Sequence, residues 1–179
     1  MNRTVSPGQS INLITSVVFN FFLALMKHVI IICDGSSLGN GSKGSRAAAV
    51  ALVGYKNRWK AFAEYIGEAT NQQAEIIAAA IGLEQLREPC RVTLFSDSRY
   101  VIETMASGWK RRANHDLWDR LDRAASNHQV EWKWIKGHAG HKLQEMVDSA
   151  ARKIASSGNA EESFLIELAE KVSKSEAVI

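Results

Sequence analysis

The distribution of apolar and polar residues predicts regular secondary structure from about residue 28 onward. Val29–Cys33 and Arg91–Phe95 are short, mainly apolar runs rich in β-branched residues, which is typical of buried strands. Ala47–Tyr55 and Trp59–Ile66 predict two further strands joined by a short turn. Val130–Ile135 alternates as a half-buried strand does. The sequence therefore predicts five strands.

Apolar residues at helical spacing predict helices between and after these strands. In the third helix, Asn114 is expected to cap the N-terminus, and Asp116–Arg120 and Asp119–Arg123 to form exposed ion pairs. The element order predicts an α/β fold with a five-stranded mixed sheet, three antiparallel strands followed by parallel ones, flanked by helices. The helices are expected at about Thr70–Arg87, Arg99–Ala106, Asn114–Ala125, Leu143–Ala155 and Glu161–Val172.

The length of 179 residues suits one domain with additional terminal segments. We expect the domain to cover residues 27–157 and the tail, 158–179, to hold one helix. Residues 1–26 form an N-terminal extension whose stretch Ile11–Met26 is strongly apolar. This stretch is shorter than the roughly 20 residues of a spanning helix, and polar residues interrupt it. It is either a dispensable extension, with Met26 as the true start, or a helix packed on the protein, or a membrane-targeting segment.

Composition and charge exclude several classes of protein. With 46% hydrophobic and 23% charged residues, the protein has the composition of an ordinary soluble globular domain. Its net charge of +3 permits a polyanionic partner without requiring one. Cys33 and Cys90 form neither a CxxC pair nor a Cys/His cluster, which argues against a disulfide framework and a structural zinc site. We therefore expect a reducing, cytoplasmic location and no membrane association.

Four acidic residues fall where they could meet at one site. Asp34 is expected to end the first strand, and Asp97 follows the fourth. Glu75 lies in the first turns of one helix and Asp148 midway along another. A buried carboxylate without a partner is costly, and hard cations such as Mg²⁺ prefer oxygen ligands. Each acid alone has an ordinary explanation: a turn, a helix-surface charge, a helix cap, or an ion pair of Asp148 with Arg152.

Five motifs in order resemble those of ribonuclease HI of the bacterial type I kind. Taken singly the motifs are weak, but together with Asp148 they cover the sequence from about His28 to Ala155. Trp109 and its basic neighbours are all that occupies the place of a long basic protrusion found in many relatives. The motifs are Asp34–Asn40, Thr70–Glu75, Ser96–Tyr100, Asn114–Trp118 and Glu131–His141.

The resemblance implies a nuclease that cuts the RNA strand of RNA–DNA hybrids. Asp34, Glu75, Asp97 and Asp148 would bind two Mg²⁺ ions, for which Mn²⁺ would substitute, and the products would carry 5′-phosphate and 3′-hydroxyl ends. His138 would assist proton transfer or product release. The enzyme would act as a monomer without an obligate protein partner.

The resemblance also implies a set of substrate contacts. The RNA strand would lie against the loop Ser37–Asn40 and against Asn71, Gln72 and Arg99, whereas Thr70 and Asn40 would lie near a DNA phosphate. The DNA backbone would meet Trp109, Lys110, Arg111 and Arg112. Of Trp118, Trp132 and Trp134, at least two are expected to pack in the core.

Three departures from the family pattern leave all four acids in place. The protrusion is missing, the glycine loop lacks its usual proline, and Gln144 stands where an asparagine is usual. A junction resolvase, integrase or exonuclease of the wider fold remains the alternative enzyme, but it would lack the paired TNxxAE and KGHAGH motifs. A catalytically silent hybrid-binding module and a membrane-tethered form are further alternatives. Retention of all four acids argues against the silent module.

Overall fold

The computed structural model describes residues 26–137 and 141–175 and contains a five-stranded sheet in the order β3-β2-β1-β4-β5. β1 pairs antiparallel with β2, and β2 with β3, whereas β1–β4 and β4–β5 are parallel pairs. This is the predicted mixed sheet, with the meander on one side and the parallel strands on the other. The strands are β1 (Lys27–Leu38), β2 (Arg46–Tyr55), β3 (Arg58–Gly67), β4 (Cys90–Ser96) and β5 (Gln129–Trp134).

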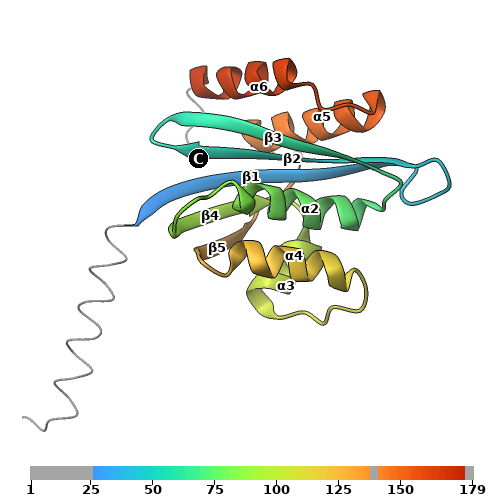
Figure 1. The fold of residues 1–179 in the computed structure, drawn as a ribbon, viewed down its shortest axis with the longest axis horizontal. Helices are drawn as coiled ribbons and strands as arrows, with labels where there is room; N and C mark the ends of the chain where they lie inside the picture. Colours follow the sequence, from blue (N-terminus) through green and yellow to red (C-terminus); the bar gives the residue numbers. More distant parts are fainter. Residues whose placement is uncertain (1–25, 138–140, 176–179) are drawn as a thin grey trace, which may run out of the picture.

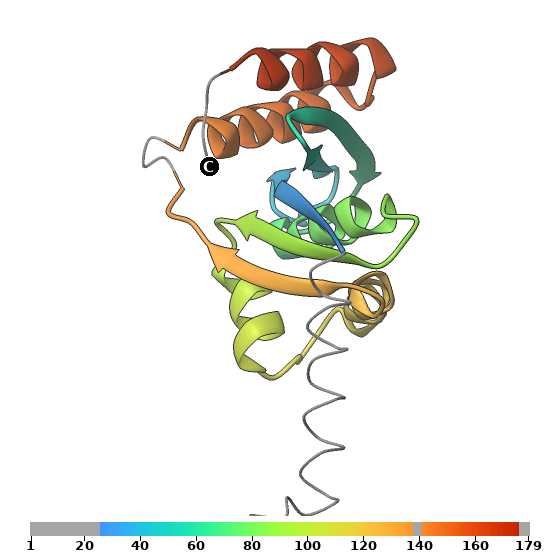
Figure 2. The same cartoon turned by 90° about the vertical axis from the view of Figure 1, so that its left-hand side faces the viewer.

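Helices cover both faces of the sheet (Figures 1 and 2). One layer lies below the sheet in Figure 1 and the other above it. The lower layer consists of α2 (Asn71–Glu84), α3 (Arg99–Ser107) and α4 (His115–Ala125), and the upper of α5 (Lys142–Ser157) and α6 (Glu162–Lys174).

Two apolar clusters form the core, one on each face of the sheet. Ile31 and Cys33 of β1 pack with α2, α3 and α4, whereas Ile32 packs with α5 and α6. This division follows from the strand geometry, because successive side chains point to opposite faces. By the same alternation, Asp34 points toward the α5 face and Gly35 toward the α2 face.

The first strand is longer than its apolar run indicates. The expectation that it stops at Asp34 is wrong: β1 continues to Leu38, and Asp34 pairs with Val50 inside the ladder. Ser36 and Ser37 pair with the buried Ala48 and Ala47 of β2, so backbone pairing continues through residues whose side chains are polar. The hydrophobic pattern therefore placed the end of the strand too early.

α4 differs from the prediction at its start and in its ion pairs. Asn114 precedes the helix with a left-handed φ of 59°, and its side chain makes no capping bond, so the predicted asparagine cap is wrong. Neither expected i,i+4 pair is present among the described ion pairs. Arg120 instead contacts Glu84 of α2 and Glu64 of β3, because the tertiary contact offers it two carboxylates.

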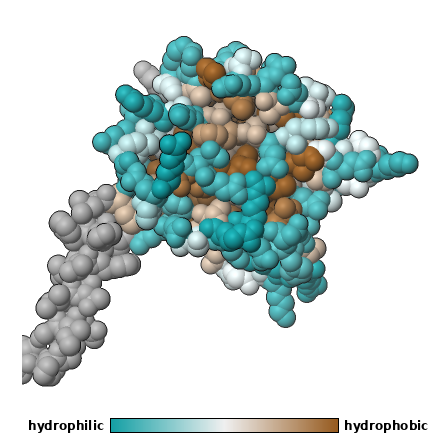
Figure 3. Space-filling view, viewed as in Figure 1, coloured by the Kyte–Doolittle hydropathy of each residue, from teal (hydrophilic) through white to brown (hydrophobic). Residues whose placement is uncertain are grey.

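The tail contains the expected helix, and α6 packs over the meander edge of the sheet with Leu168 and Val172 buried. Most of the face seen in Figure 3 is hydrophilic, with apolar patches between the polar side chains. Over residues 26–137 and 141–175, every helix falls short of the length and apolarity that crossing a membrane requires. The apolar stretch Ile11–Leu25 lies outside the described residues.

Candidate active site

Three of the four predicted acids meet at the point where β1 and β4 diverge. One carboxylate oxygen from each of Asp34, Glu75 and Asp97 lies within 4.8 Å of the others. Asp34 and Glu75 are only 3% and 7% exposed, whereas Asp97 is partly exposed. The three acids line one cavity of about 340 Å³ together with Asp148.

A glycine allows the α2 helix to approach β1 closely enough for this meeting. A Cβ atom placed on Gly35 would lie 2.3 Å from the carbonyl carbon of Ala74 and from the amide nitrogen of Glu75. No side chain larger than hydrogen fits such a contact with backbone. The Thr70 hydroxyl and the Gln73 side chain form a capping box that fixes the start of α2. Gly35 therefore places Glu75 beside Asp34.

Glu75 is held by two neutral donors. The backbone N–H of Gly35 donates to its Oε2 at 3.2 Å, and the amide group of Asn71 donates to its Oε1 at 3.3 Å. Both carboxylate oxygens are thus oriented by groups that bring no charge.

Asp97 is held mainly through its backbone. The Trp134 indole N–H donates to the Asp97 carbonyl at 3.0 Å. A Cβ atom on Gly137 would lie 2.5 Å from Oδ2 of Asp97, so this glycine makes room for the carboxylate. The carboxylate of Asp97 thus lies beside Gly137 and lines the acid cavity.

Asp148 differs from the other three acids because it has a cationic partner. Arg152 donates from its Nε to Oδ1 of Asp148 at 2.8 Å, and Arg152 also lines the cavity. Asp148 therefore lies at the rim of the three-acid cluster rather than within it. Asp148 thus forms the helical ion pair that the sequence offered as its ordinary role, and it also lines the acid cavity.

Burial and like charge act in the same direction on the inner acids. Burial, followed by the charges of Glu75 and Asp97, raises the pKa of Asp34 well above its usual range. Burial and the charge of Asp97 likewise raise the pKa of Glu75, although the hydrogen bonds from Gly35 and Asn71 oppose this effect. The site is thus electrostatically unfavourable when all three carboxylates are ionised and no cation lies between them.

A divalent metal ion fits this donor set. The ligands are all hard oxygens, they converge, and among the described residues no Lys or Arg forms an ion pair with Asp34, Glu75 or Asp97. A cation would stabilise the ionised carboxylates that burial disfavours. Asp34, Glu75 and Asp97 would hold it, with Asp148 close enough to line the same cavity.

The comparison with protein families decides which class of enzyme this is. Residues 26–156 match the family model described as RNase H. The chain belongs to the RNase H family. It is accordingly a ribonuclease H, a metal-dependent hydrolase, as the motifs predicted.

Relatives and solved structures agree with this assignment. A protein of Edwardsiella ictaluri (strain 93-146) named Ribonuclease H is 42% identical over 152 residues, covering 78% of this chain and 97% of that one. The crystal structure of LC9-RNase H1, described as a type 1 RNase H with the type 2 active-site motif, superposes with a TM-score of 0.63 at 27% identity, covering 75% and 74% of the two proteins. LC11-RNase H1, solved in complex with an RNA/DNA hybrid, shares the fold (TM-score 0.56, 20% identity, 70% and 97% covered).

Two residues predicted to bind substrate, Ser37 and Asn71, line the acid cavity of this RNase H. Asn71 donates its backbone N–H to Oδ1 of Asn40, and its own Oδ1 accepts from the backbone N–H of Ser37 at 3.2 Å. Since the same Asn71 side chain donates to Glu75, one residue joins the predicted RNA-contacting loop to the acid cluster.

Three other predicted substrate contacts do not line the acid cavity: Thr70, Gln72 and Arg99. Thr70 caps α2, and Gln72 is exposed in its first turn. Arg99 is exposed and stacks over the Trp134 ring, 5.3 Å from its centroid. Thr70 is thus partly committed to structure, whereas Gln72 and Arg99 have side chains accessible to a ligand.

The basic segment Trp109–Arg112 lies between α3 and α4 without helix or strand. Trp109 is 52% exposed, and Lys110 and Arg112 are also exposed. Arg111 is different: both its terminal nitrogens contact Asp122, and its guanidinium lies over the Trp118 ring. The contact of Arg111 with DNA stays a prediction, as do those of its neighbours.

The remaining predictions concern tryptophans and the histidine loop. Trp118 is fully buried and Trp132 packs against the same cluster, so two of the three tryptophans are in the core as expected. Trp134 is 42% exposed and makes the contacts with Asp97 and Arg99, a role that the sequence did not suggest. His138 lies outside the described residues.

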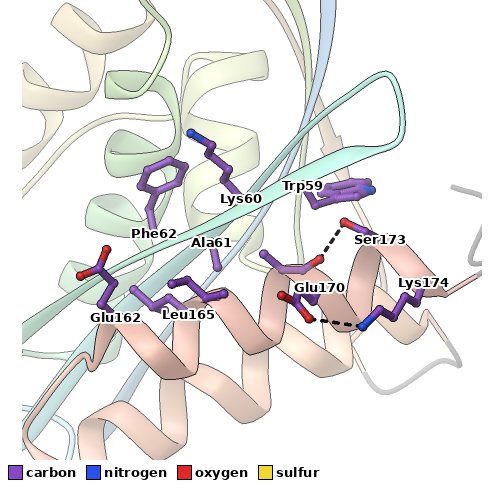
Figure 4. A pocket seen from close by; sticks show the side chains of 11 residues that line it. Trp59, Lys60, Ala61, Phe62, Glu162, Leu165, Glu170, Ser173 and Lys174 are labelled. Carbon is purple, nitrogen blue, oxygen red and sulfur yellow. Dashed lines mark hydrogen bonds and ion pairs between the residues drawn. The ribbon is translucent and has the colours of Figure 1, made fainter.

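A separate hollow lies between the edge strand β3 and α6 (Figure 4). It measures about 580 Å³, and apolar residues such as Trp59, Ala61 and Leu165 contribute much of its lining. None of the predicted site residues borders it. The acid cavity, although smaller, is where the functional groups of this RNase H converge.

Proposed function

We propose that this RNase H is an endonuclease that hydrolyses the RNA strand of RNA–DNA hybrids with two Mg²⁺ ions, giving 5′-phosphate and 3′-hydroxyl ends. The convergence of Asp34, Glu75 and Asp97 in one cavity carries the proposal. Family membership supports the hybrid as substrate. When bound, the ions would activate water and stabilise the departing 3′ oxygen.

The protein's own groups would act chiefly by positioning. The buried strand β1 and the capped start of α2 fix Asp34 and Glu75, so little reorganisation is needed on binding. Asp148 would leave or share its pair with Arg152 to serve as the fourth ligand.

Substrate discrimination would take place at the cavity mouth. Ser37, Asn40 and Asn71 offer short polar groups that suit the 2′-hydroxyls of one strand, the feature that distinguishes RNA from DNA. His138 would assist the departing group or product release.

The decisive test compares three labelled duplexes of one sequence: RNA–DNA hybrid, duplex DNA and duplex RNA. We expect cleavage of the hybrid alone, in Mg²⁺ or Mn²⁺ but not in EDTA, with product ends that only a phosphatase makes accessible to 5′ labelling. Asp97→Asn should abolish cleavage while circular dichroism shows an intact fold. Cleavage in EDTA, or by folded Asp97→Asn protein, would refute the proposed mechanism.

A truncated protein addresses the role of the N-terminal extension through the same cleavage assay, and size-exclusion chromatography gives its oligomeric state. A truncated protein beginning at Met26 is expected to fold and cleave like the full-length protein, and to elute as a monomer. Loss of solubility or activity on truncation would instead indicate that residues 1–25 pack on the domain.

A further inference from the structure

A buried glutamine contacts the most buried acid of the site. Gln144 lies in the first turn of α5, is only 2% exposed, and packs against β1. Its Nε2 donates to Oδ1 of Asp34 at 3.3 Å and to the carbonyl oxygen of Cys33 at 3.4 Å. Both bonds are long, but each reaches an acceptor on β1.

The orientation of this amide follows from its partners. The Cys33 carbonyl and the ionised Asp34 carboxylate are both hydrogen-bond acceptors, so the NH₂ end faces them whenever Asp34 is ionised, because a flipped amide would place Oε1 against two oxygens. The two N–H bonds of one amide therefore join the Asp34 side chain to the backbone of the preceding residue.

Packing alone does not require an amide here. The buried neighbours on α5, Leu143 and Val147, are apolar. Oε1 of Gln144 is buried without a hydrogen-bond partner among the described residues, an arrangement that typically costs about 1–3 kcal/mol. An unbranched apolar side chain of the same length would avoid this cost, so the amide is explained better by its contact with Asp34.

The helix geometry links this contact to the fourth acid. Gln144 and Asp148 are four residues apart on α5 and thus lie on the same helical face. α5 therefore contributes to the site at two positions: Gln144 donates a hydrogen bond to Asp34, and Asp148 supplies a carboxylate that lines the acid cavity.

We propose that Gln144 is a positioning residue that orients the Asp34 carboxylate for divalent-metal binding. The inference rests on the proposed function of the site. The amide fixes Oδ1 of Asp34 relative to its own strand, and with it the orientation of a carboxylate that also approaches Glu75 and Asp97. The glutamine that departs from the family's usual asparagine would thus set the geometry of a metal ligand.

The experiment uses Gln144→Met, which keeps length and flexibility but removes both donors. Mg²⁺ binding to the full-length protein is measured by calorimetry without nucleic acid. Loss of a partner that orients a metal ligand typically costs about 10- to 100-fold in affinity or activity, and we expect a loss in this range for Gln144→Met. Because the variant also removes the buried Oε1, its melting temperature in EDTA should equal or exceed that of the wild type.

Two comparisons separate positioning from general damage. Gln85→Leu removes another glutamine that donates to a backbone carbonyl, at the end of α2 and outside the acid cavity, and should leave Mg²⁺ affinity unchanged. Gln144→Asn keeps the amide but shortens the side chain by one methylene, and should restore part of the affinity lost in Gln144→Met. On hybrid substrate, Gln144→Met should lower kcat with KM unchanged.

Wild-type Mg²⁺ affinity and kcat in folded Gln144→Met would overturn the inference, as would loss of the fold in both Gln144 variants, which would make the residue structural. Failure of the wild type to cleave hybrid would instead count against the proposed function. The difference in Mg²⁺ affinity between the variants would still be measurable in that case.

Discussion

The acid cavity and the basic segment Trp109–Arg112 are built in opposite ways. In the cavity, Asp34 and Glu75 sit on paired or capped backbone, are almost fully buried, and accept bonds from neutral donors. In the basic segment, no regular element fixes the backbone, and Lys110 and Arg112 are exposed. The core fixes the acid cavity, whereas the basic segment contacts the rest of the domain through Arg111, which binds Asp122 and lies over Trp118.

This difference indicates how the two tasks of the enzyme are separated. Catalysis needs groups held to within a fraction of an ångström, which only packed elements provide. Binding to a phosphate backbone needs charge at approximately the right place, which an exposed segment supplies. Changes in the cavity should therefore alter kcat, and changes in the segment should alter KM and salt dependence.

The largest effect is expected for Asp34→Asn, which should reduce kcat by about 10³-fold, since one lost metal ligand removes several kcal/mol of charge stabilisation. Without divalent ions the variant should be more stable than the wild type, because it replaces a carboxylate whose ionised form the buried site disfavours. Activity assays and melting curves in EDTA check both statements.

The stability gain should depend on pH. The pKa of Asp34 is raised in the folded state, so the folded wild type retains its proton to higher pH than the unfolded protein does. In EDTA, wild-type stability is then greatest below the unfolded pKa of about 4 and falls as pH rises toward the folded value. The gap between Asp34→Asn and wild type should widen over this window. A constant gap would contradict the raised pKa.

Gly35→Ala should come next, with a fall in kcat of about 10- to 100-fold, because the new methyl group would displace the start of α2 and with it Glu75. A stability loss of about 1–3 kcal/mol is expected from the overpacking. Gly44→Ala is the matched control: its φ of +79° makes the change costly for stability, but its Cβ meets nothing within 4 Å. Equal activity losses in both variants would show that the contact with α2 is unimportant.

A smaller effect is expected on the side of substrate binding. Lys110→Ala and Arg112→Ala should each raise KM for the hybrid a few-fold and leave kcat unchanged. Each lost phosphate contact should lower the slope of log affinity against log salt by about 0.7–0.9. Binding measured at several salt concentrations in Ca²⁺ tests this. An unchanged slope would remove these residues from the interface.

The smallest effect distinguishes Arg111 from its neighbours. Arg111→Ala should cost about 1 kcal/mol of stability, since it removes a half-exposed ion pair with Asp122 and a cation–π contact with Trp118. Lys110→Ala forms the natural comparison and should leave stability unchanged. Urea titrations of the two variants give the difference directly; equal midpoints would show that the Arg111 contacts contribute nothing.

The fold could be predicted from sequence because its core elements carry strong periodic signals. The runs Val29–Cys33 and Arg91–Phe95 lie within the central strands of the sheet, and the apolar spacing in Leu143–Ala155 marked α5. The errors arose where backbone pairing or tertiary contact outweighed local pattern. β1 runs on through polar Ser36 and Ser37, and Arg120 prefers Glu64 and Glu84 to a partner on its own helix.

The candidate site shows the same division. The order and spacing of the acids and motifs identified Asp34, Glu75 and Asp97, which the fold brings together, and the ion pair of Asp148 with Arg152 that the sequence also offered is present. Trp134 gave no signal of its contact with Asp97, because an alternating strand looks the same whichever face meets the site. Such details depend on distances between elements and are absent from a linear pattern.

The extension of β1 beyond Asp34 has a geometric consequence. Asp34, a metal ligand in the proposed function, and Ser37, a predicted contact of the RNA, belong to one continuous strand. Three residues of antiparallel strand span about 10 Å. The strand would thus hold the contact with the recognised nucleotide at a fixed distance from the bond that is cut, because both groups belong to the same stretch of extended backbone.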